Sequence, residues 1–110
     1  MENCIFCKII NKEIPTNLIF ENDNFVAFND IKPKAKIHIL IVPKKHIESI
    51  KTIEDSDKDL MGELLLVAKK IAKEKNMEGY ELIFNVGREG GQLIDHLHLH
   101  LLSSDWPRLA

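Results

Sequence analysis

The strongest periodic pattern in the chain predicts a long helix. Apolar residues recur at three- and four-residue spacing through residues 60–72, as they do on the buried face of an amphipathic helix. Ser56, followed three residues later by Asp59, is a candidate N-terminus, and the lysine-rich segment 69–75 suits the C-terminal end. The apolar positions of this helix are Leu60, Met61, Leu64, Leu65, Ala68, Ile71 and Ala72.

Five short apolar segments predict strands, and they occupy residues 17–21, 25–29, 38–42, 80–86 and 94–102. The first two flank Asn22-Asp23-Asn24, which has turn chemistry, so we expect a hairpin there. Residues 30–36 are polar and contain Pro33, which predicts a loop, and residues 4–11 predict a short helix. We therefore predict an α+β fold, a five-stranded antiparallel sheet with one long helix and a short N-terminal helix.

Length and charge limit the range of functions. The chain has 110 residues, which predicts a single domain over residues 1–110. Its net charge of −2 gives no general attraction to nucleic acid or to an anionic membrane, so phosphate binding needs a local site. The N-terminus lacks the basic and apolar pattern of a secretory signal, and no apolar run approaches the length of a membrane span. We therefore expect a cytoplasmic protein.

Three histidines in strict alternation stand out in the last predicted strand. His96, His98 and His100 alternate with leucines, and alternate side chains of a strand share one face. We therefore expect the leucines to face the core and the imidazoles to line the other surface. Imidazole clusters serve metal binding and nucleophilic or acid–base catalysis, and the spacing alone does not choose between these uses.

A glycine-rich segment lies directly before these histidines. Gly87, Gly90 and Gly91 permit positive φ and close backbone approach, and such a turn can direct N–H groups at an anion. By itself this segment is no more than a hairpin connection. Before three imidazoles it favours a phosphate held where a histidine can attack.

Two cysteines form a Cys4-x-x-Cys7 pair near the N-terminus. Taken alone, this weak motif fits a redox pair, half of a metal site, or coincidence. A redox pair is typical of a position after a strand, which this pair does not have. A tetrahedral zinc site needs two more ligands, and His46 and His96 can supply them.

Several motifs in order along the chain resemble the histidine triad (HIT) family. The segment from Gly91-Gln92 to His96-Leu97-His98-Leu99-His100-Leu101-Leu102 is similar to its His-φ-His-φ-His-φ-φ signature, where φ is apolar. The remaining motifs resemble its Hint branch, the purine nucleoside phosphoramidases. They are Ile5-Phe6-x-Lys8-Ile9-Ile10, Glu13-Ile14-Pro15, Phe28-x-Asp30-Ile31, His38, Val42-Pro43-Lys44-Lys45-His46-Ile47 and Asp105-Trp106-Pro107.

The resemblance implies a role for each matching residue. His98 is the implied nucleophile, His100 contacts the phosphate and the leaving-group side, and His38 supports them. Asp30 takes the ribose hydroxyls, Gly91 belongs to the nucleotide site, and the side chains of Asn85 and Gln92 bind phosphoryl oxygens or order the loop. The apolar slot for the purine comprises Ile5, Phe6, Ile9, Ile14, Phe28 and Ile31, for each of which plain core packing is the alternative. Zinc-containing bacterial relatives imply a structural Zn²⁺ ion on Cys4, Cys7, His46 and His96.

The implied activity is hydrolysis of AMP-like phosphoramidates by a homodimer through a nucleotidyl-histidine intermediate. Two alternatives stay open: a dinucleoside polyphosphate hydrolase, and a nucleotide- or partner-binding module with vestigial catalysis. Three positions depart from the family pattern: Leu93 where some relatives have serine, Asp95 where an aromatic or apolar residue is commoner, and Ser103-Ser104 in place of Gly-Gly. These departures concern substrate preference, which the sequence leaves open together with the choice between adenine and guanine.

Overall fold

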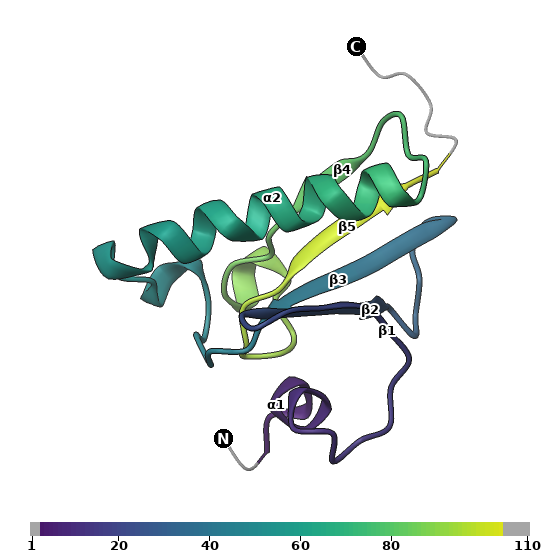
Figure 1. The fold of residues 1–110 in the computed structure, drawn as a ribbon. Coiled ribbons are helices and arrows are strands. Elements are labelled where there is room, and N and C mark those ends of the chain that lie inside the picture. Colours follow the sequence, from purple (N-terminus) through teal and green to yellow (C-terminus); the bar gives the residue numbers. More distant parts are fainter. Residues whose placement is uncertain (1–2, 105–110) are drawn as a thin grey trace.

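Figure 1 shows an antiparallel sheet with one helix on each face, in a computed structural model that describes residues 3–104. The elements are α1 (Ile5–Ile10), β1 (Leu18–Glu21), β2 (Phe25–Asn29), β3 (Ile37–Pro43), α2 (Lys58–Glu74), β4 (Glu81–Ile83) and β5 (Leu99–Ser103). Short 3-10 helices lie at Ile50–Thr52, Asp55–Asp57 and Arg88–Gly90. The five strands follow the order β1-β2-β3-β5-β4, and every neighbouring pair is antiparallel. The α+β fold predicted from the sequence is confirmed.

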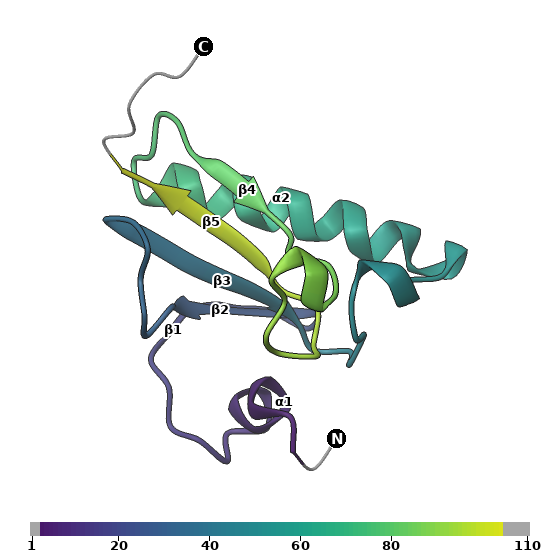
Figure 2. The ribbon, with the colours of Figure 1, turned by 180° about the vertical axis from the view of Figure 1, so that it is seen from behind.

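The larger core lies between the sheet and α2, which runs along one face of it (Figures 1 and 2). The helix buries Leu64, Val67, Ala68, Ile71 and Ala72, a set with the expected helical spacing. Leu65, which the sequence pattern placed on the apolar stripe, is instead exposed. The helix begins at Lys58 rather than at Ser56, because the Asp55–Asp57 3-10 turn precedes it.

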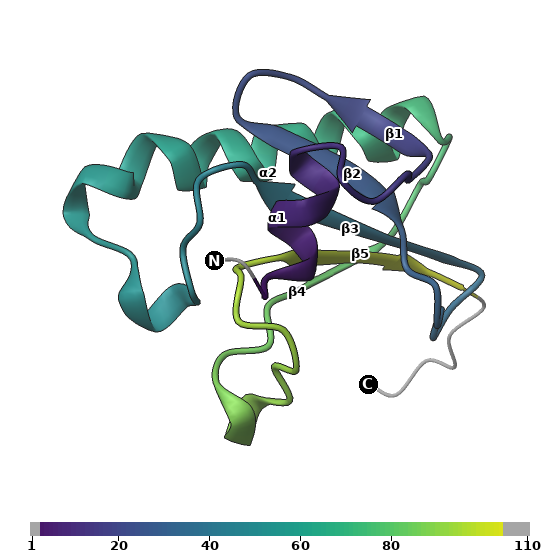
Figure 3. The ribbon, with the colours of Figure 1, turned by 90° about the horizontal axis from the view of Figure 1, so that it is seen from below.

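A smaller cluster fills the space between α1 and the opposite face of the sheet, where Figure 3 shows α1 lying across the strands. Its buried members are Phe6, Ile9, Val26, Phe28, Leu40 and Val42. Since β3 is covered on both faces, it is buried almost throughout, as its nearly continuous apolar sequence requires. The candidate functional side chain of His98 lies on this α1 face, against Phe6.

Two predicted strands are shorter in the structure, for reasons visible in the backbone. The segment predicted at 94–102 joins the ladder only from Leu99, because its partner β3 ends at Pro43, which has no N–H to donate. The Leu97 N–H donates to the Ile47 carbonyl instead. The segment predicted at 80–86 pairs only over Glu81–Ile83, after which the chain leaves the sheet for the glycine loop.

The predicted β1–β2 hairpin forms, and Asn22 organises its turn. The Asn22 Oδ1 atom accepts from the amides of Asn24 and Phe25 at 2.9 and 2.8 Å.

No helix in residues 3–104 is both long enough and apolar enough to cross a membrane. The Asp105-Trp106-Pro107 motif lies outside the described residues.

Candidate active site and metal centre

The three alternating histidines separate from their leucines as expected. Leu97, Leu99 and Leu101 are buried in the α2-side core. His96, His98 and His100, the histidine row, lie on the α1 face, where the His98 ring meets those of Phe6 and His100 at centroid distances of 5.1 and 5.0 Å. Two of the three precede the ladder of β5, yet the alternation of faces extends back to them.

His98 is held in one tautomer by its own backbone neighbour. Its Nδ1 atom lies 2.7 Å from the His96 carbonyl oxygen. A carbonyl can only accept, so Nδ1 carries the proton and Nε2 keeps a free lone pair. Burial lowers the pKa of His98, which keeps the imidazole neutral near pH 7. The geometry thus produces a desolvated, neutral imidazole with an available nucleophilic nitrogen.

A chain of hydrogen bonds fixes the tautomer of His100. The Lys34 amide donates to His38 Nδ1 at 3.1 Å, so the proton of His38 sits on Nε2. That Nε2–H donates to His100 Nδ1 at 2.8 Å, which leaves the proton of His100 on its own Nε2. Among the buried side-chain nitrogen and oxygen atoms that the structure describes, only His100 Nε2 has no hydrogen-bond partner. His100 therefore offers an unsatisfied N–H donor beside the lone pair of His98.

Burial keeps these imidazoles uncharged. It is the main cause that lowers the pKa of His100 to about 4, and the neighbouring His98 and His38 rings add to it. The pKa of His38 is lowered by burial as well, against the opposing effect of the Asp30 carboxylate. Asp30 Oδ2 lies 3.5 Å from His38 Nε2, and Oδ1 accepts from the Lys32 amide at 2.9 Å.

Asp30, His38 and His100 are close enough together to suggest a metal site, but their protons argue against one. A metal ligand must present a lone pair, and the Lys34 amide already occupies that of His38 Nδ1. His38 Nε2 carries the proton that His100 accepts. We therefore interpret these three side chains as a hydrogen-bonded relay that orients His100.

Gln92 organises the glycine loop from within. Its side chain is 2% exposed, and its Oε1 accepts from the Gly87 amide at 2.9 Å. Its Nε2 donates to the carbonyls of Glu48 and Ile94 at 2.8 and 2.9 Å. Asn85 likewise donates to the Gly90 carbonyl at 2.9 Å. Of the two roles expected for Gln92 and Asn85, these contacts are those of loop ordering.

The loop glycines act through their conformation rather than through free amides. Gly87 and Gly91 have φ angles of 70° and 86°, which favour glycine, whereas Gly90 lies in a 3-10 turn. The amides of Gly87, Gly90, Gly91 and Gln92 all donate within the loop. The expected cradle of glycine N–H groups is therefore not formed by these four amides.

Two residues that depart from the family pattern lie at the end of this loop. The Arg88 guanidinium donates to both oxygens of Asp95, at 2.9 and 3.0 Å, which explains the carboxylate at that position. Leu93 is 81% exposed and brings no hydroxyl to the site. No pattern in the sequence predicts the Arg88–Asp95 pair, because neither residue is unusual in a polar loop.

The expected purine slot divides into two groups. Phe6, Ile9 and Phe28 are buried and Ile14 packs against them, as in plain core packing. Ile5 and Ile31 are exposed, Ile31 by 91%. The structure therefore brings the first group together beneath the site and leaves the second group open to a ligand.

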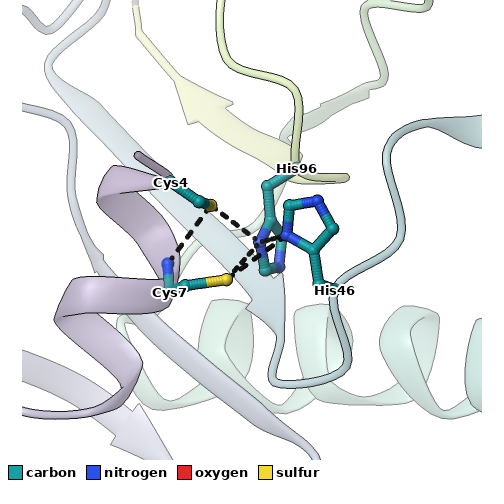
Figure 4. A group of neighbouring side chains, drawn as sticks. All are labelled: Cys4, Cys7, His46 and His96. Carbon is teal, nitrogen blue, oxygen red and sulfur yellow. Dashed lines mark hydrogen bonds between the residues drawn. The ribbon is translucent and has the colours of Figure 1, made fainter. Parts of the chain in front are cut away.

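A second cluster of four side chains joins the N-terminus to the sheet, and Figure 4 shows them pointing toward one another. This four-ligand cluster comprises Cys4, Cys7, His46 and His96. His96 Nδ1 lies 3.3 Å from Cys4 Sγ, 3.6 Å from Cys7 Sγ and 3.1 Å from His46 Nδ1. His46 Nδ1 lies 3.3 Å from Cys7 Sγ.

The donor set of this cluster fits a tetrahedral cation. The His96 Nε2–H donates to the Pro43 carbonyl at 2.8 Å, so His96 Nδ1 presents its lone pair to the cluster. Ligand atoms around zinc, at roughly 2.3 Å for sulfur and 2.0 Å for nitrogen, lie roughly 3.3–3.8 Å apart. The contacts above come close to that spacing. Burial and Cys4 raise the pKa of Cys7 to about 11, a cost that a bound cation would remove by stabilising the thiolate.

Comparisons with known proteins identify the family of this chain. A family model described as "Scavenger mRNA decapping enzyme C-term binding" matches residues 3–109. Protein HitA from Neisseria gonorrhoeae is 39% identical over 105 residues, which cover 94% of this chain and 98% of the relative. The chain belongs to the histidine triad family.

Solved HIT structures share the fold over nearly their whole length. A HIT family hydrolase from Legionella pneumophila has a TM-score of 0.92 and 47% identity, covering 94% of this chain and 95% of that one. A histidine triad nucleotide-binding protein from Candida albicans has a TM-score of 0.82 and 36% identity, covering 98% and 85%. The histidine row is thus the triad for which the family is named.

Proposed function

We propose that this HIT protein hydrolyses purine nucleoside 5′-phosphoramidates through a covalent intermediate on His98. The observation that carries this proposal is the tautomer of His98, whose Nδ1–H is committed to a carbonyl and whose Nε2 lone pair is free. A binding module has no need of a desolvated nucleophile. The Legionella relative, described as a hydrolase, and the Candida relative, described as nucleotide-binding, support the same conclusion.

The reaction divides into two displacements at phosphorus. His98 Nε2 attacks the α-phosphorus, a nitrogen–phosphorus bond to the imidazole forms, and the bond to the leaving nitrogen breaks as that nitrogen takes up a proton. Water then attacks the same phosphorus and releases a proton to solvent, the phosphorus–nitrogen bond to His98 breaks, and the nucleoside monophosphate leaves with the His98 lone pair restored. The unsatisfied His100 N–H, oriented by His38, donates to a phosphoryl oxygen while negative charge develops there.

Residues around the triad offer contacts to the ribose and the base of the nucleoside. The Asp30 carboxylate, beside His38, is our candidate acceptor for the ribose hydroxyls. Ile31 and Ile5, both exposed, offer apolar contact to a purine ring, above a floor that contains Phe6 and Phe28. Asn85, Gly91 and Gln92 shape the loop that borders the phosphate.

We further propose that the four-ligand cluster binds zinc. Two sulfurs and two imidazole nitrogens are a common structural zinc set. When bound, the ion would cross-link α1 to the β3–α2 connection and to the segment that carries His96. It would take no part in the displacement steps.

We also propose a homodimer and a cytoplasmic location. β4 is an edge strand, and exposed apolar residues lie on it (Leu82), just before it (Tyr80) and on α2 (Leu65 and Leu66). A second copy placed against this surface would cover these side chains and extend the sheet. Free thiol ligands suit a reducing compartment.

The test is hydrolysis of adenosine 5′-phosphoramidate by the wild type and by His98→Ala, with AMP release followed by chromatography. We expect turnover by the wild type and a loss of roughly 10³-fold or more in the variant, with AMP affinity retained. If the wild type binds AMP without any turnover, the phosphoramidase proposal is wrong. A dinucleoside polyphosphate assay then distinguishes another HIT substrate class from a binding role.

A further inference from the structure

His96 belongs both to the histidine row and to the four-ligand cluster, and it therefore connects the candidate metal centre to His98. Its ring is anchored between the Pro43 carbonyl and the other members of the four-ligand cluster. Its backbone carbonyl accepts the Nδ1–H of His98 at 2.7 Å. Because His96 is completely buried, its ring and carbonyl have little freedom to move separately. A cation that fixes the ring therefore also fixes the group that selects the tautomer of His98.

A second connection runs through α1. Cys4 is the N-cap of this helix and its Sγ atom accepts from the Cys7 amide at 3.3 Å, so both thiols lie at the N-terminal end of α1. Between them in sequence, the buried Phe6 ring meets His98 edge-on at a centroid distance of 5.1 Å and an interplanar angle of 80°. A cation on Cys4 and Cys7 therefore holds in place the ring that packs against the nucleophile.

The four-ligand cluster is also accessible without unfolding. A cavity of about 750 Å³ lies beside it, lined by Asn3, Cys4, Ile5, His46, Leu93, Ile94 and Asp95. Two of these residues, Cys4 and His46, belong to the cluster. Ions and small chelators can therefore reach the ligands in the folded protein.

From these contacts, and on the basis of the function proposed above, we propose that a divalent cation on the four-ligand cluster positions His98 for attack. Its occupancy then sets the fraction of protein with the reactive tautomer. A cation that only stabilised the fold would change the unfolding temperature and leave His98 in folded molecules unaltered. The positions of His96 and Phe6 predict a change in His98 itself.

The first experiment compares zinc-loaded and chelator-treated wild type at one fixed pH. Long-range ¹H–¹⁵N spectra of the imidazoles report the tautomer of His98 directly, without any substrate. We expect one Nδ1-protonated form in the loaded protein and a mixture after zinc removal. Under the same conditions kcat should fall by roughly 10–100-fold, the range for groups that orient a site, with KM changed less than about threefold.

A core variant serves as the matched control for stability. Ile71→Val removes one buried methylene from α2, on the sheet face away from both clusters, and lowers the unfolding temperature. It should leave the His98 tautomer and kcat unchanged. A folded, zinc-free protein that keeps the single tautomer would overturn the proposal, even if its unfolding temperature has dropped. If loaded protein shows the tautomer change without phosphoramidate turnover, the proposed function fails and the positioning role stands.

A second measurement applies even where zinc removal unfolds the protein. Coupling between two sites is reciprocal, so deleting the His98 hydrogen bond should weaken zinc binding. In competition with a chromophoric chelator, we expect roughly tenfold lower zinc affinity for His98→Ala than for the wild type. His100→Ala is the control, because the His100 ring makes no contact with the four-ligand cluster, and this variant should keep the wild-type affinity for zinc. Equal zinc affinities in all three proteins would refute the coupling.

Discussion

The side chain of Gln92 gives the sharpest quantitative test of how the active-site loop is held. It lies 2% exposed inside the loop and makes three hydrogen bonds to backbone groups. Gln92→Glu keeps the size and the acceptor for the Gly87 amide. It also places a second carboxyl oxygen against the carbonyls of Glu48 and Ile94, which lose their donor.

The cost of this substitution follows from the number of donors lost. Each buried polar group left without a partner costs about 1–3 kcal/mol. When the new carboxyl is protonated it restores one donor, so we expect a loss of about 2 kcal/mol. When it is ionised both carbonyls lack a donor, and the loss becomes about 4 kcal/mol.

The difference between these two states fixes the pH dependence. About 2 kcal/mol corresponds to a rise of about 1.5 units in the folded-state pKa of the new carboxyl, above about 4.3 in the unfolded chain. The unfolded state then loses its proton first, so the destabilisation grows as pH rises from about 4.3 toward about 6. Between pH 5 and pH 8 it should grow by about 1 kcal/mol.

Urea denaturation of the wild type, Gln92→Glu and Gln92→Met at pH 5 and pH 8 measures these quantities. Gln92→Met loses all three bonds, including the acceptor for the Gly87 amide, and adds no titratable group, so its destabilisation should not depend on pH. The reasoning is refuted if Gln92→Glu loses less than about 1 kcal/mol at pH 8, or if its loss relative to wild type is the same at both pH values.

Other perturbations test the surroundings of the triad. His38→Phe removes the donor that orients His100 and should lower kcat by about tenfold. This is less than the roughly 10²–10³-fold fall in kcat expected when a transition-state donor itself is lost. Steady-state kinetics measure the change. Because the pKa of His100 is lowered to about 4, the unfolded chain takes up its proton first, and the free energy of unfolding should fall as pH drops from 6.5 toward 4. The charged and titratable groups around this ring are His38, His98, Asp30 and Lys34. Since the pKa of His96 is also lowered to about 4, His100→Asn should reduce the slope of this dependence without abolishing it in denaturant titrations at several pH values, and an unchanged slope would contradict the prediction. Asp95→Asn breaks an ion pair whose side chains are more than half exposed, so it should lower the free energy of unfolding by less than about 1 kcal/mol in a denaturant titration. Leu66→Glu should convert a dimer to monomers in analytical ultracentrifugation if α2 contributes to the interface.

The sequence predicted the fold well where side-chain periodicity determines it. The helix, the hairpin and the faces of the last strand all follow from apolar spacing. Strand ends were less predictable because they depend on the partner strand. β5 joins the ladder only at Leu99, since Pro43 on β3 cannot donate, and no pattern within residues 94–98 carries that information.

The sequence could predict which residue types form the site, but not which ring nitrogens of its histidines carry a proton. Spacing alone brought His98 and His100 to one face. Their tautomers depend on the His96 carbonyl and the Lys34 amide, backbone groups that every residue possesses. Similarly, the Gln92 amide bonds to loop backbone groups because of where the chain folds back, which its residue type does not specify.

The pattern that builds the site also fixes its register. Leu97, Leu99 and Leu101 are at most 2% exposed in the α2-side core, and each precedes or follows an imidazole. A slip of one residue would turn those leucines away from α2 and bury three imidazoles in an apolar core without partners. The correct register is therefore favoured by both sets of side chains. The same alternation that packs α2 against the sheet also places His98, the proposed nucleophile, against Phe6.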